Sequence, residues 1–317
     1  VCGNANYADD NPEPHGCLHA YPVLAPITSG FIKSIDTSKA LEVAGVKRIL
    51  SADDVPGKLD IGPVFPGDVL LTNHEIQYHG QPVLVVVAKS YEIARRAARL
   101  VVIECEQTTP ILDIKEAIKK EHWVRPPHSL NRGNSEQAIN NAAHQLTGEI
   151  NIGGQEHFYL EGQIALAQPD NDGGIHVQCS TQHPTEVQHL VAKILKKPFS
   201  FVNVETRRMG GAFGGKETQS FIFAAICTLL SKKTKLPVKL RMDRDDDILI
   251  TGKRHDFHAD YEVGFNDKGV IEGVKIKLAS RCGISPDLSG AINSRALLHI
   301  DNAYYLSDVS VENYLCK

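Results

Sequence analysis

The chain has 317 residues, of which 42% are hydrophobic and 23% are charged, and its net charge is −4 at pH 7. This length exceeds that of a typical single domain and predicts two domains, while the interspersed charges exclude the basic surface that nucleic acid requires. Neither an apolar run of about 18 residues nor a signal-peptide pattern occurs, so the sequence argues against a membrane partner and secretion and favours a cytoplasmic protein.

The first part of the chain, residues 1–107, alternates strand-like and helix-like patterns, which predicts a small mixed α/β domain. Its strongest strand is the β-branched run at 82–87, which is continuous enough to be buried on both faces. The remaining predicted elements are strands at 30–35, 46–50 and 101–104, a short helix after Asp36, and a helix at 91–100.

Residues 108–145 lose this regularity. They contain Pro110, the pair Pro126–Pro127 and the pair Asn140–Asn141, around one short amphipathic segment at 114–118. Because prolines and asparagines favour turns and loops, the sequence predicts a long connecting segment here.

Regular patterns return in residues 146–317, which we expect to form a second domain. Apolar residues with helical spacing behind Pro184 predict an amphipathic helix. Alternating apolar and polar residues at 257–265 and 274–278, on either side of a glycine-containing turn, predict an antiparallel hairpin. Mixed helices and strands place the chain in the α+β class. The other strands expected in this part lie at 146–152 and 175–179.

A glycine-rich segment, Met-Gly-Gly-Ala-Phe-Gly-Gly-Lys-Glu at 209–217, precedes the apolar run at 221–230. Glycines leave backbone N–H groups open to a ligand, and the N-terminus of a helix favours anions. The segment therefore predicts a loop that binds an anionic or oxo ligand at the start of a long buried helix. The structural alternative is that these glycines serve only a tight strand-to-helix turn or close packing.

A phosphate-binding P-loop is a second alternative for this segment, because Gly210, Gly215 and Lys216 have the spacing of that motif. The next residue should be Ser or Thr, whose hydroxyl binds magnesium, but it is Glu217, which would repel a phosphate. The dinucleotide pattern G-x-G-x-x-G is also missing between Gly210 and Gly215. A divergent P-loop nucleotide binder therefore stays the weaker alternative.

Candidate metal sites built from protein side chains have little support. The seven cysteines are scattered and never in C-x-x-C spacing, which argues against disulfide frameworks, zinc ribbons and iron–sulfur clusters. His74 and His79 are one residue too far apart for the zinc motif H-E-x-x-H. His255 and His258 start the predicted hairpin out of phase, so a metal site shared by these two histidines is not expected.

Two segments carry a family resemblance, Gly-Gln-Glu-His-Phe-Tyr-Leu-Glu at 154–161 and the glycine segment with Arg208 before it. Both resemble the molybdenum hydroxylases, whose branches include xanthine dehydrogenases and aldehyde oxidases, and the xanthine dehydrogenase branch in particular. The similarity extends through shorter stretches at 51–57, 180–184, 243–247 and 301–305. The stretches at 158–163 and 287–290 are more similar to the separate molybdenum-binding subunit of a bacterial xanthine dehydrogenase.

The resemblance implies that residues 1–107 form the α/β hammerhead domain of the family and residues 146–317 the first part of its molybdopterin-binding domain, with 108–145 between them. The implied cofactor is molybdenum–molybdopterin, with the metal held by the pterin dithiolene. Iron–sulfur clusters and FAD would lie on a partner subunit or on other domains of a hetero-oligomer.

The resemblance also implies roles for individual residues. The side chain of Gln155 would hydrogen-bond an oxo ligand of molybdenum, and the backbone around Phe213 would approach the same ligand, neither one ligating the metal directly. Glu217 matches the carboxylate with which xanthine dehydrogenases contact a purine. The family usually has glycine in place of Ala212, so this alanine requires a negative φ angle. The cofactor-binding residues implied here are Gln155, Gly211, Ala212, Phe213 and Gly214.

The implied activity is that of a purine hydroxylase, which converts hypoxanthine to xanthine and urate and passes electrons through iron–sulfur clusters and FAD to NAD⁺. The arginine and the glutamate base of the family would follow Lys317, so we expect the chain to be a fragment without turnover on its own. An aldehyde or other N-heterocycle hydroxylase of the same family and a non-catalytic assembly module stay open as alternatives.

Overall fold

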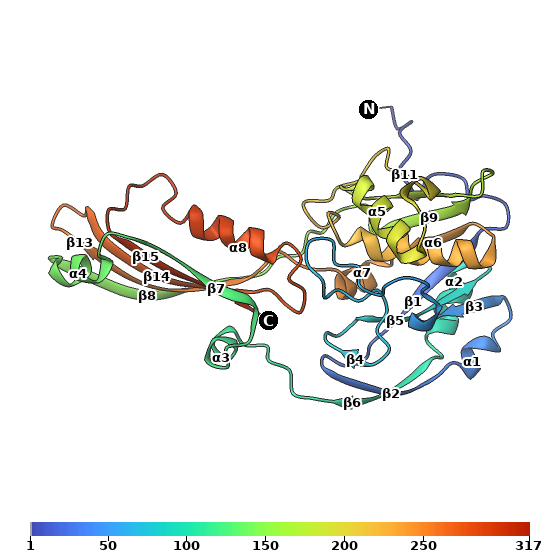
Figure 1. Ribbon diagram of the computed structural model, residues 1–317, viewed down its shortest axis with the longest axis horizontal. Helices are drawn as coiled ribbons and strands as arrows, with labels where there is room; N and C mark the ends of the chain where they lie inside the picture. Colours follow the sequence, from blue (N-terminus) through green and yellow to red (C-terminus); the bar gives the residue numbers. More distant parts are fainter. Residues whose placement is uncertain (1) are drawn as a thin grey trace. The chain divides into compact units, whose positions relative to one another are not determined.

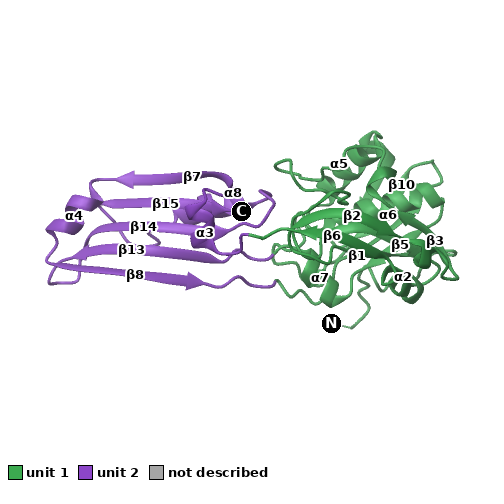
Figure 2. Ribbon diagram, turned by 90° about the horizontal axis from the view of Figure 1, so that it is seen from below, with its two compact units in different colours: residues 1–110, 157–252 green, residues 111–156, 253–317 purple. Residues whose placement is uncertain are grey.

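The computed structural model describes residues 2–317 and divides them into two compact units (Figure 1, Figure 2). Unit 1 comprises the chain up to Pro110 together with His157–Gly252, and unit 2 comprises Ile111–Glu156 together with Lys253–Lys317. The compact units therefore do not follow the predicted linear division into 1–107, 108–145 and 146–317. The reason is that strands distant in sequence pair with one another, which no local pattern reveals.

Unit 1 is built on a seven-stranded sheet with the order β11-β10-β9-β12-β1-β5-β3. The parallel pairing of β1 with β12 joins the N-terminal part of the chain to the part after His157. These strands are β1 Leu18–Leu24, β3 Val46–Leu50, β5 Pro82–Ala88, β9 Ile164–Pro169, β10 Ile175–Cys179, β11 Val202–Glu205 and β12 Val238–Arg241. A separate three-stranded sheet, β4-β2-β6, consists of β2 Gly30–Asp36, β4 Glu75–Ile76 and β6 Val102–Gln107.

The core of unit 1 confirms the strongest sequence predictions. Every residue of β5 is buried, as its continuous β-branched run predicts. The helix α6, Ser220–Thr234, is buried on nearly all sides between β9 and α5, Pro184–Leu195, because its apolar residues surround it completely. Three further helices are α1 Ser38–Leu41, α2 Tyr91–Ala98 and α7 Arg244–Ile250, and short 3₁₀ turns lie at Ala52–Asp54 and Phe199–Phe201.

Unit 2 is a five-stranded sheet with the order β7-β15-β14-β13-β8, drawn in purple in Figure 2. The predicted hairpin is present as β13 and β14, and β8 extends it on the other side of β13. The helices α3 and α4 pack on one face of the sheet and α8 packs on the opposite face. The strands are β7 Trp123–Arg132, β8 His144–Ile152, β13 Phe257–Phe265, β14 Ile271–Arg281 and β15 Val309–Cys316, and the helices are α3 Ile114–Lys119, α4 Ser135–Asn141 and α8 Ser289–Leu298.

The prediction of a connecting segment at 108–145 is wrong, because this stretch contains α3, β7, α4 and the start of β8. Pro126 and Pro127 lie within β7, and β7 is an edge strand of its sheet. Proline cannot donate a backbone hydrogen bond, but an edge strand has one side without a partner strand and tolerates it. Of the helices in residues 2–317, none is both long enough and apolar enough to cross a bilayer.

Close packing of α4 on the sheet depends on two glycines. A methyl group at Gly273 of β14 would lie 2.9 Å from Ala138 Cβ, and one at Gly264 of β13 would lie 2.8 Å from Ala142 Cβ. Carbon atoms in a packed core do not approach so closely, so both positions require the absence of a side chain.

We expect Gly273→Ala to lower the free energy of unfolding by about 1–3 kcal/mol, because the added methyl group forces α4 away from the sheet. Chemical denaturation followed by circular dichroism measures this change. Gly153→Ala is the matched control, since no atom lies within 4 Å of the added group. Equal stability of the two variants would contradict the packing argument.

Candidate functional site

The predicted glycine loop lies in unit 1 between β11 and α6 and has no regular secondary structure. Its backbone is left-handed at three positions, with φ angles of +96° at Gly211, +56° at Phe213 and +89° at Gly214. Glycine adopts this conformation without strain, whereas Phe213 does so at a steric cost. Ala212 is not among the residues with positive φ, as its methyl group requires.

The segment that starts at His157 packs directly against the loop. A methyl group at Gly215 would lie 2.7 Å from Tyr159 Cε1 and 2.8 Å from His157 Cγ, and one at Gly210 would lie 2.6 Å from Glu161 Cβ. Only glycine fits at these two positions, so part of the glycine content serves packing, as the structural alternative proposed.

The buried ammonium group of Lys216 links the loop to neighbouring segments of unit 1. Lys216 is fully buried, and its Nζ donates to the carbonyl oxygen of Glu161 and to Ser180 Oγ, both at 2.7 Å, and lies 3.4 Å from Glu161 Oε2. The same carboxylate accepts the N–H of Gly210 at 2.8 Å. Burial lowers the pKa of the Lys216 ammonium, and the charge of Glu161 opposes that shift. The inward direction of Lys216 argues against the P-loop alternative, in which this side chain reaches the phosphates.

A second set of buried, hydrogen-bonded residues surrounds Asp247 of α7. Its carboxylate accepts the Tyr159 hydroxyl at 2.6 Å and the N–H of Gln163 at 2.9 Å. The amide of Gln163 then donates to the carbonyl oxygen of Gly215 at 3.0 Å. Burial, together with the hydrogen bond to Asp247, raises the pKa of Tyr159, so its hydroxyl remains a donor. These contacts fix the loop to the core of unit 1.

Gln182 is a second glutamine that contacts the loop, and no sequence prediction named it. Its side-chain Oε1 accepts the backbone N–H groups of Gly214 at 3.2 Å and Lys216 at 3.3 Å. Its backbone N–H donates to the carbonyl oxygen of Lys216 at 2.9 Å. With Oε1 engaged in this way, the orientation of the side chain is set and its Nε2 remains a donor. The only sequence signal was its place in the family-like stretch at 180–184.

Gln155, predicted to contact an oxo ligand, lies in unit 2. Its backbone pairs with Arg254 through hydrogen bonds of 3.3 and 3.0 Å, and the residue is exposed. The stretch 153–161 is thus divided between the units, and the part that packs on the glycine loop starts at His157. The role of Gln155 stays a prediction.

The loop and the residue that follows it offer groups of several chemical types. The ring of Phe213 is 75% exposed, and within residues 2–317 the N–H groups of Ala212 and Phe213 donate to no acceptor. Glu217 is half-buried, and its Oε1 lies 3.5 Å from where a side chain on Gly214 would begin. Backbone donors, an aromatic face and a carboxylate together suit a planar or oxygen-rich ligand.

Comparisons with known families account for this combination of fold and loop. Residues 118–317 match the molybdopterin cofactor-binding domain, and residues 2–109 match the a/b hammerhead domain of aldehyde oxidase and xanthine dehydrogenase. The chain belongs to the molybdenum hydroxylase family. This confirms the predicted family, its two domain types and the α+β class, whereas the likeness to a separate bacterial subunit stays a prediction.

Relatives and solved structures agree with this assignment. The chain is 38% identical to a xanthine dehydrogenase/oxidase of Gallus gallus and 40% identical to a xanthine dehydrogenase of Oryza sativa, covering 100% of this chain and 23% of each relative. It therefore spans about a quarter of their length. The fold is similar to an aldehyde oxidoreductase of Desulfovibrio gigas, with a TM-score of 0.88 and 22% identity over 97% of this chain and 36% of that one. A quinoline 2-oxidoreductase of Pseudomonas putida gives a TM-score of 0.86 and 23% identity over 97% of this chain and 42% of that one.

Replacing Lys216 by methionine should destabilise unit 1 by roughly 3–5 kcal/mol, because the Glu161 carboxylate would lose its buried counter-charge. Thermal and urea unfolding measure the change. Lys193→Met, at an exposed position of α5, is the control and should remain within about 0.5 kcal/mol of the parent. If the two variants were equally stable, the ion pair would not hold the loop.

Proposed function

We propose that this chain forms part of the molybdenum-cofactor site of a purine hydroxylase that converts hypoxanthine to xanthine and xanthine to urate. The observation that carries the proposal is the half-buried Glu217 carboxylate beside a glycine loop with free backbone donors. Relatives named xanthine dehydrogenase support the choice of a purine.

The residues of the loop fit the molybdenum–molybdopterin group. Oxo and phosphate oxygens need N–H donors, and the N–H groups of Ala212 and Phe213 and the side-chain amide of Gln182 are available for them. We therefore assign the contact with an oxo ligand to Gln182, in the role that the sequence analysis gave to Gln155. The bound group would supply the two-electron redox chemistry of the reaction.

Glu217 would select the substrate. Its carboxylate can accept the N–H groups of a purine ring and stabilise the charge that develops during hydroxylation. The exposed aromatic ring of Phe213 belongs to the same loop and offers a face on which a planar heterocycle can stack. Both side chains belong to unit 1, so the substrate contacts proposed here do not depend on unit 2.

Other parts of the reaction would come from outside residues 1–317. We propose that a general base, the iron–sulfur clusters and FAD lie on further domains or on a partner subunit, in keeping with the quarter of its relatives that this chain spans. A second candidate is an aldehyde hydroxylase, which the similarity of fold to an aldehyde oxidoreductase favours. The carboxylate of Glu217 distinguishes the two candidates, because an aldehyde has no N–H group to donate to it.

In the cofactor-loaded protein that contains this chain, Glu217→Gln and Glu217→Val should lower kcat/KM for xanthine by roughly 10²-fold, the effect of losing one contact made in the transition state. Steady-state urate formation measures the change, and Glu136→Gln on the exposed surface of α4 is the control. Unchanged xanthine kinetics together with lost aldehyde oxidation would favour the aldehyde candidate instead.

Gln182→Glu tests the assignment of the amide donor. The variant keeps oxygen acceptors for the N–H groups of Gly214 and Lys216 but removes the amide donor, so the loop should persist while kcat falls roughly 10²-fold. The matching variant Gln155→Glu should retain activity if Gln182 holds this role. A large loss in Gln155→Glu alone would return the role to Gln155.

A further inference from the structure

The polar face of the unit 2 sheet brings four side chains together from two strands. Glu149 of β8 pairs directly with Asp260 of β13, and Asn151 pairs with His258 two residues along. Alternate residues of a strand point to the same face, so all four side chains lie on one side of the sheet. Two carboxylates that face each other across a strand pair repel, unless positive charge lies between them.

His258 points its ring at this acidic pair. The residue is only 3% exposed, its Nδ1 lies 2.8 Å from Asn151 Oδ1, and its Nε2 lies 3.2 Å from Asp260 Oδ1. The Asn151 oxygen only accepts, so Nδ1 is the donor of this hydrogen bond, and Nε2 faces a carboxylate oxygen of Asp260. A cation between Nε2 and the two carboxylates would be bound by a lone pair of the imidazole and by carboxylate oxygens at once.

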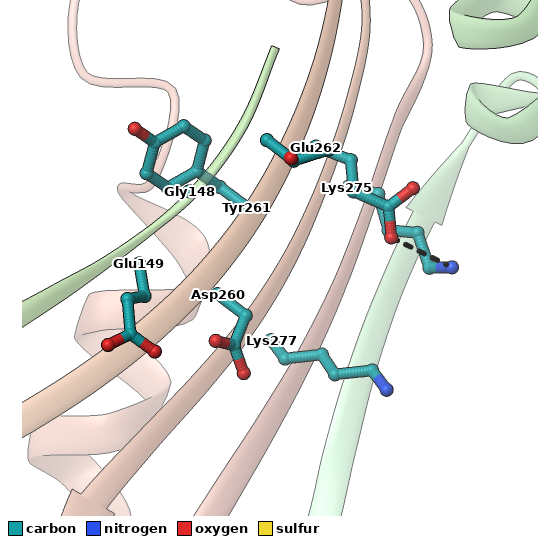
Figure 3. A pocket seen from close by; sticks show the side chains of 8 residues that line it. Gly148, Glu149, Asp260, Tyr261, Glu262, Lys275 and Lys277 are labelled. Carbon is teal, nitrogen blue, oxygen red and sulfur yellow. Dashed lines mark ion pairs between the residues drawn. The ribbon is translucent and has the colours of Figure 1, made fainter.

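The surroundings already attract positive charge. Lys115 Nζ donates to Glu149 Oε2 at 2.7 Å. Beside the carboxylates is an open hollow of about 480 Å³, into which Lys277 and the Glu262–Lys275 ion pair also face (Figure 3). This hollow gives a hydrated ion access to the carboxylates from solvent.

We propose that Glu149, His258 and Asp260 bind a divalent metal ion of the zinc type. Their donor atoms all lie within 4.8 Å of one another, so small side-chain rotations bring them to one ion. An imidazole nitrogen with two carboxylates suits Zn²⁺ better than Ca²⁺ or Mg²⁺, which bind oxygen almost exclusively. The two carboxylates balance the charge of the ion.

Two neighbouring residues have distinct parts in this site. Asn151 holds the His258 ring by accepting its Nδ1–H, the arrangement that orients most histidine ligands of metals. Lys115 occupies Glu149 in the absence of metal and must leave it when the ion binds. The ammonium is therefore a competitor of the metal, and its removal should strengthen binding.

The test is Zn²⁺ uptake by the protein that contains this chain, measured by equilibrium dialysis and elemental mass spectrometry after weakly bound metal has been removed with a chelator. The parent should take up one more Zn²⁺ per chain than His258→Leu, Asp260→Asn or Glu149→Gln. Glu149 and Asp260 are exposed, so these two variants separate loss of the site from loss of the fold. Asn151→Ala should weaken binding by roughly 10–100-fold.

Two further variants separate a metal site from an ordinary network of ion pairs. Lys115→Ala should lower the Zn²⁺ dissociation constant, because the competing ammonium is gone. His144→Leu, which removes an exposed His144–Asp267 pair from the same sheet, should leave uptake unchanged. Equal uptake by the parent and by Glu149→Gln and Asp260→Asn, or weaker binding in Lys115→Ala, would overturn the proposal.

Discussion

The buried ion pair of Lys216 and Glu161 is the interaction on which the glycine loop depends. Glu161 accepts the N–H of Gly210 at the start of the loop and contacts the ammonium of Lys216 at its end, so one carboxylate closes both ends. Ser180, at the end of β10, accepts from the same ammonium. Because the buried ammonium donates to both Glu161 and Ser180, the loop and the two segments that carry these residues depend on one another.

This anchoring explains how the loop can keep a strained residue on its surface. The backbone of Phe213 has a left-handed φ angle, which costs a non-glycine residue about 1–2 kcal/mol. Its ring is 75% exposed, so burial of the ring does not offset this cost. The surrounding contacts hold it there, and strain kept in this way is characteristic of binding sites. The flanking glycines, Gly211 and Gly214, adopt left-handed φ angles without strain, and the N–H groups of Ala212 and Phe213 between them donate to no acceptor within residues 2–317.

Sequence patterns predicted the elements whose information is local. The continuous run of β5, the apolar α6 and the alternating hairpin of β13 and β14 were all predicted, because periodicity and composition determine them. The strand β7 was missed, because its prolines are tolerated only at a sheet edge and the edge is a property of the whole sheet. The loop was recognised from its glycines, but Gln182 was not, since its contacts with Gly214 and Lys216 join residues 32 and 34 positions apart.

The cluster on the unit 2 sheet was not predicted for the same reason, because its residues are distant in sequence: Asn151 and His258 are 107 positions apart. Alternation in β13 places His258 and Asp260 on one face, but only the register with β8 brings Glu149 to them. The two candidate sites differ in the charge of the ligand that each is suited to bind. The loop presents N–H donors and suits oxygen-rich anionic groups, whereas the sheet presents lone pairs and suits cations. A metal held by protein side chains in unit 2, as proposed, would therefore be chemically distinct from a pterin-bound metal at the loop.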